Sequence, residues 1–146
     1  MITPRSSDAI TAPSAATLAN ITYRQLDYWA RQGWVTPSIE PGVGRPGRRL
    51  YGPADVIKLA ALGHFGRSGA DVGILGPKLA RLNLTDVPDD YVLVATGGDV
   101  IVVGASELRA VLARPGTSSL FDPAGLRAKL EPAPQMVEPV GSRRSA

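Results

Sequence analysis

The hydrophobic and polar positions of the chain change their spacing once, near residue 90. Before that point apolar residues recur every three or four positions, as on one face of an α-helix. After it, the apolar runs "YVLVA" and "VIVV" flank the turn "TGGD", which is the pattern of a β-hairpin. The change predicts an α+β chain whose first part is helical and whose second part forms a sheet.

Two helices are predicted near the N-terminus. The segment "APSAATLA" favours helix, with Pro13 early in it, and Asn20 can end it in the left-handed conformation. Thr22 and Gln25 match a capping box for the next helix, and Gly33 supplies the left-handed residue after its last turn. Only "NIT" separates the two helices, which indicates a helix-turn-helix.

The second of these helices, from Tyr23 to about Gln32, divides into two faces. One face is predicted to enter the core and holds Leu26, Trp29 and Ala30, with Tyr23 near its start. The other face is predicted to stay outside the core and holds Arg24, Asp27, Tyr28 and Arg31.

Residues 34–51 read "WVTPSIEPGVGRPGRRLY", and their three prolines and three glycines exclude a regular helix. The ends "WVTP" and "RRLY" suit β-structure and are predicted to pair as a two-stranded ribbon. Three arginines lie at or beside its glycine-rich tip: Arg45, Arg48 and Arg49. Because such tips commonly reach a phosphate backbone, a ribbon in this position is interpreted as a wing.

Two more helices are predicted before residue 83. One begins at Pro53 with Gly52 at its cap and Asp55 in its first turn, where a negative charge suits the helix dipole. The other covers about residues 70–82 and is weakened by two glycines and a proline. His64 ends the first of them and is interpreted as structural, since no second histidine or cysteine exists to share a metal.

The rest of the chain is predicted to form a second, smaller unit. Residues 1–9 are interpreted as a flexible arm, 10–82 as the helical unit, 83–90 as a linker and 132–146 as a disordered tail. Between them, residues 91–131 read β-β-α-β-α: the hairpin, a helix capped by Ser106, the strand "SSLF" and a helix capped by Asp122. Such a short unit is expected to dock on the first unit or on another copy of itself.

Composition excludes several classes of site and protein. The 146 residues include no cysteine and one histidine, which removes disulfides, thiolate metal sites and a cysteine nucleophile. No apolar run reaches the roughly 18 residues of a membrane span, and the N-terminus lacks the apolar core of a secretory signal. A cytoplasmic protein is expected, and the Ala- and Arg-rich composition indicates a GC-rich bacterium or its phage.

The basic residues are concentrated in the first part of the chain. The net charge of the whole is +3, but residues 1–85 hold ten basic and five acidic residues, or +5, and residues 86–146 hold six and eight, or −2. A basic surface attracts polyanions such as DNA at long range. The alternative is an ordinary solvated surface, because +5 over 85 residues is modest.

Three segments together resemble the winged-helix DNA-binding domain of the MerR family: "LANITYRQLDYWARQGWVTPS", "GRRLYGPADVIKLAAL" and "GRSGADVGIL". The resemblance spans about residues 10–80. It implies that Arg24 enters the major groove, where its planar fork can address guanine, that Tyr28 meets phosphate and that Trp29 is core. The residues expected at DNA are Tyr23, Arg24, Gln25, Tyr28, Arg31, Arg45, Arg48, Arg49 and Tyr51, the last closing the wing.

The chain departs from the family's pattern in two ways. No heptad run follows the winged helix, so the long coiled coil through which the family dimerises is not expected. Metal- and redox-sensing members use cysteines, and this chain has none, so sensing through thiolates is excluded.

Three functions are compatible with these patterns. The first is a sequence-specific, double-stranded DNA-binding transcription regulator. The second is an architectural DNA-binding protein of recombination, similar to the excisionases. The third is a protein-interaction module or antitoxin that acts through residues 91–131, which could also form a homo-oligomer. An enzyme is not expected, since Asp89 and Asp90 lie in the linker and "GVGRPG" lacks the Lys-Ser/Thr of a phosphate loop; neither a cofactor nor a metal is implied.

Overall fold

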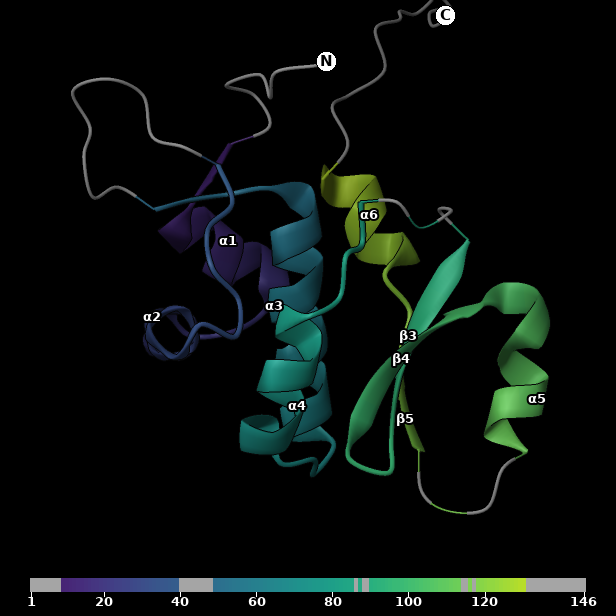
Figure 1. Cartoon of the computed structure of the whole chain (residues 1–146). Helices are drawn as coiled ribbons and strands as arrows, with labels where there is room; N and C mark the ends of the chain where they lie inside the picture. Colours follow the sequence, from purple (N-terminus) through teal and green to yellow (C-terminus); the bar gives the residue numbers. More distant parts are fainter. Residues whose placement is uncertain are drawn as a thin grey trace, which may run out of the picture.

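The computed structural model describes residues 9–39, 49–85, 87, 90–113, 116 and 118–130. It is an α+β structure in which helices pack against a three-stranded antiparallel sheet (Figure 1). The first part contains β1 (Ile10–Thr11), α1 (Ala12–Ala19), α2 (Tyr23–Gln32), β2 (Leu50–Tyr51), α3 (Pro53–Arg67) and α4 (Val72–Ala80). The second part contains β3 (Tyr91–Thr96), β4 (Asp99–Gly104), a 3₁₀ turn (Ala105–Glu107), α5 (Leu108–Leu112), β5 (Ser118–Phe121) and α6 (Ala124–Leu130).

The signals that begin and end α1 and α2 act as the sequence predicts. Asn20 ends α1 with a φ of 59°. The Thr22 hydroxyl accepts a hydrogen bond from the Gln25 N–H at 3.0 Å, and the Gln25 amide oxygen accepts one from the Thr22 N–H at 2.9 Å. Gly33 ends α2 with a φ of 78°. The predicted capping box and the helix-turn-helix are therefore confirmed.

The strand pairing at the base of the wing differs from the prediction. β2 pairs with β1, so that Tyr51 lies opposite Ile10, and a single bridge joins Leu50 to Ile39. The segment 34–37 forms no strand, because Val35 turns into the core and Pro37 has no N–H to donate. The ribbon predicted between "WVTP" and "RRLY" is therefore wrong, while its tip lies outside the described residues.

Asp55 joins the start of α3 to the segment that leads into the wing. Its Oδ2 accepts hydrogen bonds from the backbone N–H of Gly52 at 2.9 Å, the backbone N–H of Ser38 at 3.0 Å and the Ser38 hydroxyl at 2.6 Å. A single buried carboxylate oxygen thus holds two chain segments together, a larger role than the dipole effect predicted for it.

The sheet has the strand order β4-β3-β5, so β3 is its central strand. Gly97 and Gly98 form the hairpin turn with φ values of 59° and 79°, the left-handed pair that a tight hairpin requires. Alternate β3 residues face opposite ways: Leu93 packs in the cluster shared with the helices, whereas Val94 packs in a second cluster with Val111 of α5. Because β3 is covered on both faces, its sequence is continuously apolar.

The predicted β-β-α-β-α order of residues 91–131 is present, with one local difference. The chain after β4 forms a 3₁₀ turn, and α5 begins only at Leu108. No side-chain hydrogen bond caps either element, so the prediction that Ser106 caps this helix is wrong. Asp122 does cap the next segment, since its Oδ1 accepts from the Ala124 N–H at 3.0 Å.

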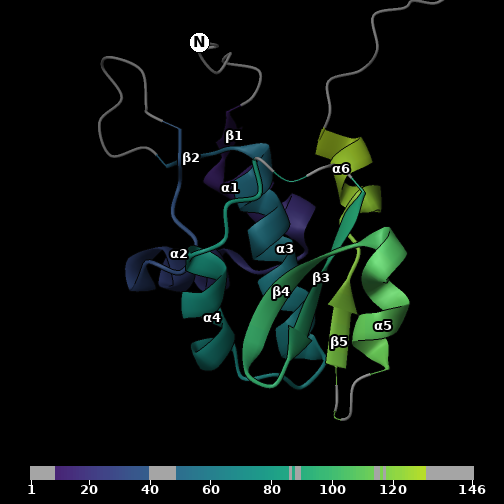
Figure 2. The ribbon, with the colours of Figure 1, turned by 45° about the vertical axis from the view of Figure 1, so that its right-hand side comes forward.

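One hydrophobic cluster joins the two parts of the chain. It contains Leu26 of α2, Phe65 of α3, Leu79 of α4 and Leu93 of β3. Figures 1 and 2 show the sheet between α3 and α4 on one side and α5 on the other. Of the two docking modes expected for the second unit, the structure shows the one in which it packs on the helical unit.

The Trp34 ring packs against α4 at Gly76, where the missing side chain of glycine lets the ring approach the helix backbone closely. A Cβ on residue 76 would overlap the indole ring, with its Cγ and Cε3 atoms at 2.6 Å. This close approach explains a glycine in the middle of a helix, where it otherwise costs about 1 kcal/mol relative to alanine.

Gly76→Ala is therefore expected to lower the free energy of unfolding by about 1–3 kcal/mol, the cost of overpacking, despite the gain in helix propensity. Urea denaturation measures it. Gly125→Ala in α6 is the matched control, because its Cβ would meet nothing within 4 Å and the change is expected to be neutral or stabilising. If Gly76→Ala and Gly125→Ala change the free energy of unfolding equally, the close contact with Trp34 is not the reason for the glycine at position 76.

Candidate nucleic-acid interface

Helix α2 presents one exposed face and one buried face. Leu26 and Trp29 are buried, whereas Arg24, Gln25, Tyr28 and Arg31 are exposed. The predicted division of the helix is confirmed for Leu26, Trp29, Arg24, Tyr28 and Arg31. The exposed set forms a polar and basic row along the outer side of the molecule.

The sequence predicts Tyr23 on the buried face of α2, and this part of the prediction is wrong. Its side chain is 53 % exposed. At 3.6 residues per turn, Tyr23 lies about 90° around the helix from the middle of Leu26 and Trp29. It therefore stands at the margin of the buried stripe, next to the exposed row, and remains available for contact with another molecule.

The Tyr28 ring is exposed, and one side of it packs against Trp34. It meets the Trp34 ring edge to face, with the ring centroids 5.8 Å apart and the planes at 90°. Trp34 in turn rests on Gly76 of α4. This contact limits the positions open to the Tyr28 side chain, which is still 52 % exposed.

Gln25 contributes one end of its side chain to the fold. Its amide oxygen accepts hydrogen bonds from the Thr22 N–H and the Thr22 hydroxyl, the latter at 3.3 Å. The NH₂ group takes no part in this capping box. Any contact of Gln25 with DNA would therefore use the NH₂ group, as a donor.

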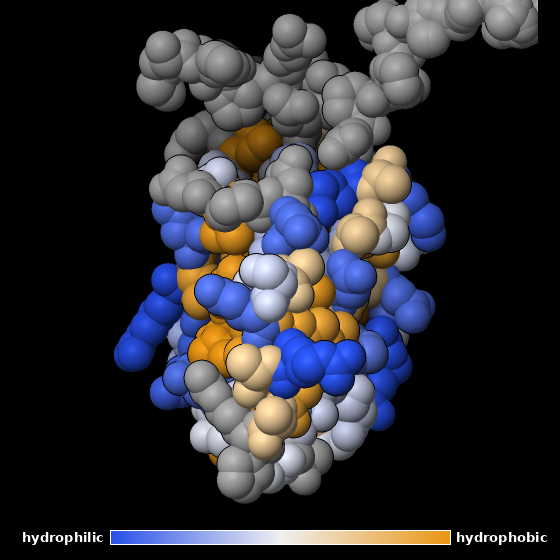
Figure 3. Space-filling model, turned by 90° about the vertical axis from the view of Figure 1, so that its right-hand side faces the viewer, coloured by the Kyte–Doolittle hydropathy of each residue, from blue (hydrophilic) through white to orange (hydrophobic). Residues whose placement is uncertain are grey.

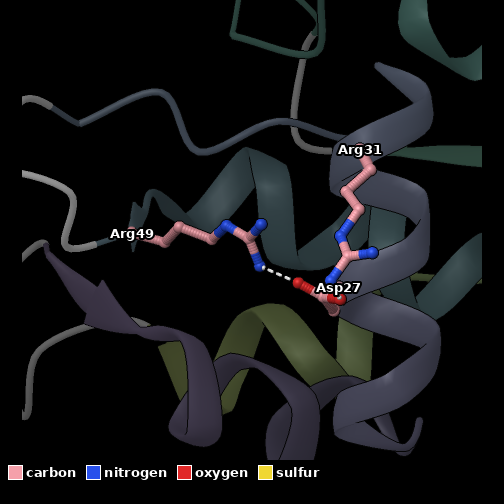
Figure 4. A network of polar contacts seen from close by, with 3 residues as sticks. All are labelled: Asp27, Arg31 and Arg49. Carbon is pink, nitrogen blue, oxygen red and sulfur yellow. Dashed lines mark hydrogen bonds and ion pairs between the residues drawn. The ribbon is translucent and has the colours of Figure 1, made fainter.

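Asp27 lies between two arginines of the exposed surface (Figure 4). Its Oδ2 pairs with Nη2 of Arg31, and its Oδ1 accepts from Nη1 of Arg49, both at 2.7 Å. The Arg49 hydrogen bond lowers the pKa of Asp27, and the same bond raises the pKa of Arg49. This network ties the middle of α2 to the base of the wing.

The sequence reveals only half of this network. Asp27 and Arg31 are four residues apart on one helix, the spacing at which opposite charges meet. Arg49 is 22 residues from Asp27 along the chain, and nothing in the local pattern connects the two. The sequence predicts only that Asp27 lies on the outer face of α2, and indicates no partner for it.

Tyr51 does not belong to the exposed surface. Its side chain is fully buried, at 0 % exposure, and burial raises its pKa to about 12. Its hydroxyl has no hydrogen-bond partner among the described residues. The prediction that Tyr51 contacts DNA disagrees with this structure, because strand β2 directs the ring into the core.

Of the three arginines predicted in the wing, the structure describes one. Arg49 stands directly before β2 with a partly exposed side chain. Arg45 and Arg48 lie outside the described residues, and their contact with DNA stays a prediction.

Other kinds of site are not seen in the described part of the chain. It contains no group of three or more His, Cys, Asp or Glu side chains able to hold a metal ion. None of its helices has the length and apolar character that a bilayer crossing requires. The His64 ring lies 5.9 Å from that of Phe65 and 5.7 Å from that of Phe121, so it packs where α3 meets β5, as a structural residue does.

Comparison with known proteins agrees with this geometry. Residues 10–70 match the family described as "MerR HTH family regulatory protein". A segment of 47 residues is 53 % identical to uncharacterized HTH-type transcriptional regulators of Mycobacterium bovis and of two strains of Mycobacterium tuberculosis. It covers 32 % of this chain and 21 % of each relative, so the likeness concerns one part of longer proteins. Residues 10–70 form a helix-turn-helix domain of the MerR family.

Proposed function

We propose that the protein is a cytoplasmic transcription regulator that binds double-stranded DNA at a specific sequence through the exposed face of α2 and the wing. The supporting observation is the arrangement of α2, which buries Leu26 and Trp29 and presents Arg24, Tyr28 and Arg31 outward beside Arg49. Its work is binding rather than catalysis.

The exposed residues supply the two kinds of contact that such binding needs. Arg24, in the first turn of α2, suits a base edge, because recognition helices read the major groove with their N-terminal residues. Tyr23 and Tyr28 offer hydroxyl groups, and Gln25 offers its NH₂ group. Phosphate contacts, which supply most of the affinity, are assigned to Arg31 and Arg49, together with Arg45 and Arg48.

The direct test is a selection of bound sequences from random duplex DNA, followed by titration of the selected duplex at several salt concentrations. Enrichment of one short motif, bound more weakly as salt rises, supports the proposal. Failure to enrich any motif, with equal binding to all duplexes, would contradict sequence-specific regulation.

An architectural role in recombination is the second candidate. The observation that favours it is the absence of a long helix after α4 in the described part of the chain, where the nine residues Val72–Ala80 are followed by the sheet. Footprinting separates the two roles: adjacent direct repeats favour an architectural protein, and one inverted repeat favours a dimeric regulator.

Self-association through residues 91–131 is the third candidate. β3 has a partner strand on each side, so it offers no open edge, whereas the outer edge of β4 has no partner strand within the described part. Leu112 of α5 is 48 % exposed, and hydrophobic residues gather in the middle of the face drawn in Figure 3. Light scattering of the full chain decides: twice 15.3 kDa supports a dimer, and 15.3 kDa contradicts it. An interaction with a different protein would use the same surface.

A further inference from the structure

A carboxylate stands in the middle of a surface whose other described charged groups, Arg24, Arg31 and Arg49, are basic. Asp27 projects from the same face of α2 as Arg24 and Arg31, and its side chain is 25 % exposed. Each of its oxygens holds a different guanidinium at 2.7 Å, one from its own helix and one from the base of the wing. An acidic residue at this position repels a polyanion and so weakens its binding. If Asp27 only stabilised the fold, that stabilisation would have to outweigh the loss of binding.

We propose that Asp27 determines specificity by restraining Arg31 and Arg49, so that they meet DNA phosphates in one register of the duplex and resist the others. The inference rests on the proposed DNA binding. The carboxylate holds both guanidinium groups in one place while leaving other N–H donors of each arginine available, since a guanidinium carries five.

The restraint affects specific and non-specific complexes differently. A complex in the correct register binds phosphates with the arginines as they stand, without loss of the Asp27 pairs. A complex in any other register needs the long side chains to swing away from Asp27, which breaks an ion pair and leaves the carboxylate facing phosphate. Discrimination of this kind comes from a repulsive element directed at the wrong partner.

Asp27→Asn removes the charge and nearly conserves the shape of the side chain. Two partly exposed ion pairs are lost, so we expect binding to a non-specific duplex to strengthen roughly 3- to 10-fold. The logarithmic salt slope of non-specific binding should steepen by roughly 0.9 to 1.8, because one or two further phosphates are neutralised. Affinity for the selected duplex should change less, so the specificity ratio falls.

Two matched proteins separate this effect from a general change in charge. Asp99→Asn adds the same +1 charge at the start of β4, outside the helix-turn-helix domain, and is expected to leave the ratio unchanged. Asp27→Asn placed in an Arg31→Ala, Arg49→Ala background is expected not to steepen the salt slope, because neither arginine that pairs with Asp27 is present. Thermal melting of each variant confirms that it is folded.

The outcomes are distinct. A lower specificity ratio with a steeper non-specific slope supports the inference. An unchanged ratio, or weaker binding to both duplexes with the original slope, overturns it while leaving the proposed function in place. Wild-type protein that binds no duplex at low salt would instead overturn the proposed function, and this inference with it.

Discussion

Arg24→Ala is expected to bind the selected duplex roughly 5- to 150-fold more weakly and to accept other bases at one position of the site. This range corresponds to the roughly 1–3 kcal/mol of discrimination that a bidentate arginine–guanine contact provides. Arg24 is exposed in the first turn of α2. Arg31 and Arg49 are held by Asp27, whereas no ion pair of Arg24 is seen within the described residues, so its whole fork is available for a base.

Competition binding against every single-base variant of the site measures the effect. Arg48→Ala is the informative comparison, because we assign Arg48 to a phosphate and expect the loss of such a contact to weaken all sequences alike. Arg109→Ala, an exposed arginine of α5 on the other side of the sheet from α3 and α4, controls for the loss of one positive charge away from the interface. An Arg24→Ala protein that retains the wild-type base preference at every position would show that another residue reads the sequence.

Asp55→Ala should lower the free energy of unfolding by about 3 kcal/mol. The carboxylate accepts from three donors on two segments, and the Gly52 N–H, which is buried, would lose its acceptor. A buried donor without a partner costs roughly 1–3 kcal/mol, and hydrogen bonds to a charged group are among the stronger ones. The loss should also weaken DNA binding, because Asp55 holds Ser38, which enters the wing, to the start of α3.

Urea denaturation of the variants tests this role. Asp71→Ala is the control, since Asp71 caps α4 through one hydrogen bond to the Gly73 N–H and its loss is expected to cost only about 1 kcal/mol. If Asp55→Ala and Asp71→Ala destabilise the protein equally, the three-donor arrangement contributes no more than an ordinary helix cap.

Features determined by neighbouring residues were predictable from the sequence. The Thr22–Gln25 capping box, the left-handed Asn20 and Gly33 and the cap at Asp122 each depend on a few consecutive positions. The same holds for the two faces of α2, because helical spacing alone separates Leu26 from Tyr28. Local chemistry therefore identified the helix-turn-helix and most of its exposed row.

Features that depend on distant segments were missed or misassigned. The pairing of β1 with β2 and the bond from Arg49 to Asp27 join residues far apart in the chain, for which no local pattern exists. The motif around Tyr51 predicts a DNA contact because it lies beside the wing, yet the burial of Tyr51 depends on the packing of β2. A motif locates a residue along the chain, and the packing decides which way its side chain points.

The single hydrophobic cluster that spans both parts of the chain has a consequence for cooperativity. α3 lies against β5, α4 lies against β4, and their side chains share one core with β3. We expect the protein to unfold in one two-state transition, in which the sheet and the α2 surface are lost together. A fragment cut at the linker would expose the apolar sides of α3 and α4 to water. We therefore expect that the helix-turn-helix unit does not stay folded when it is separated from the sheet.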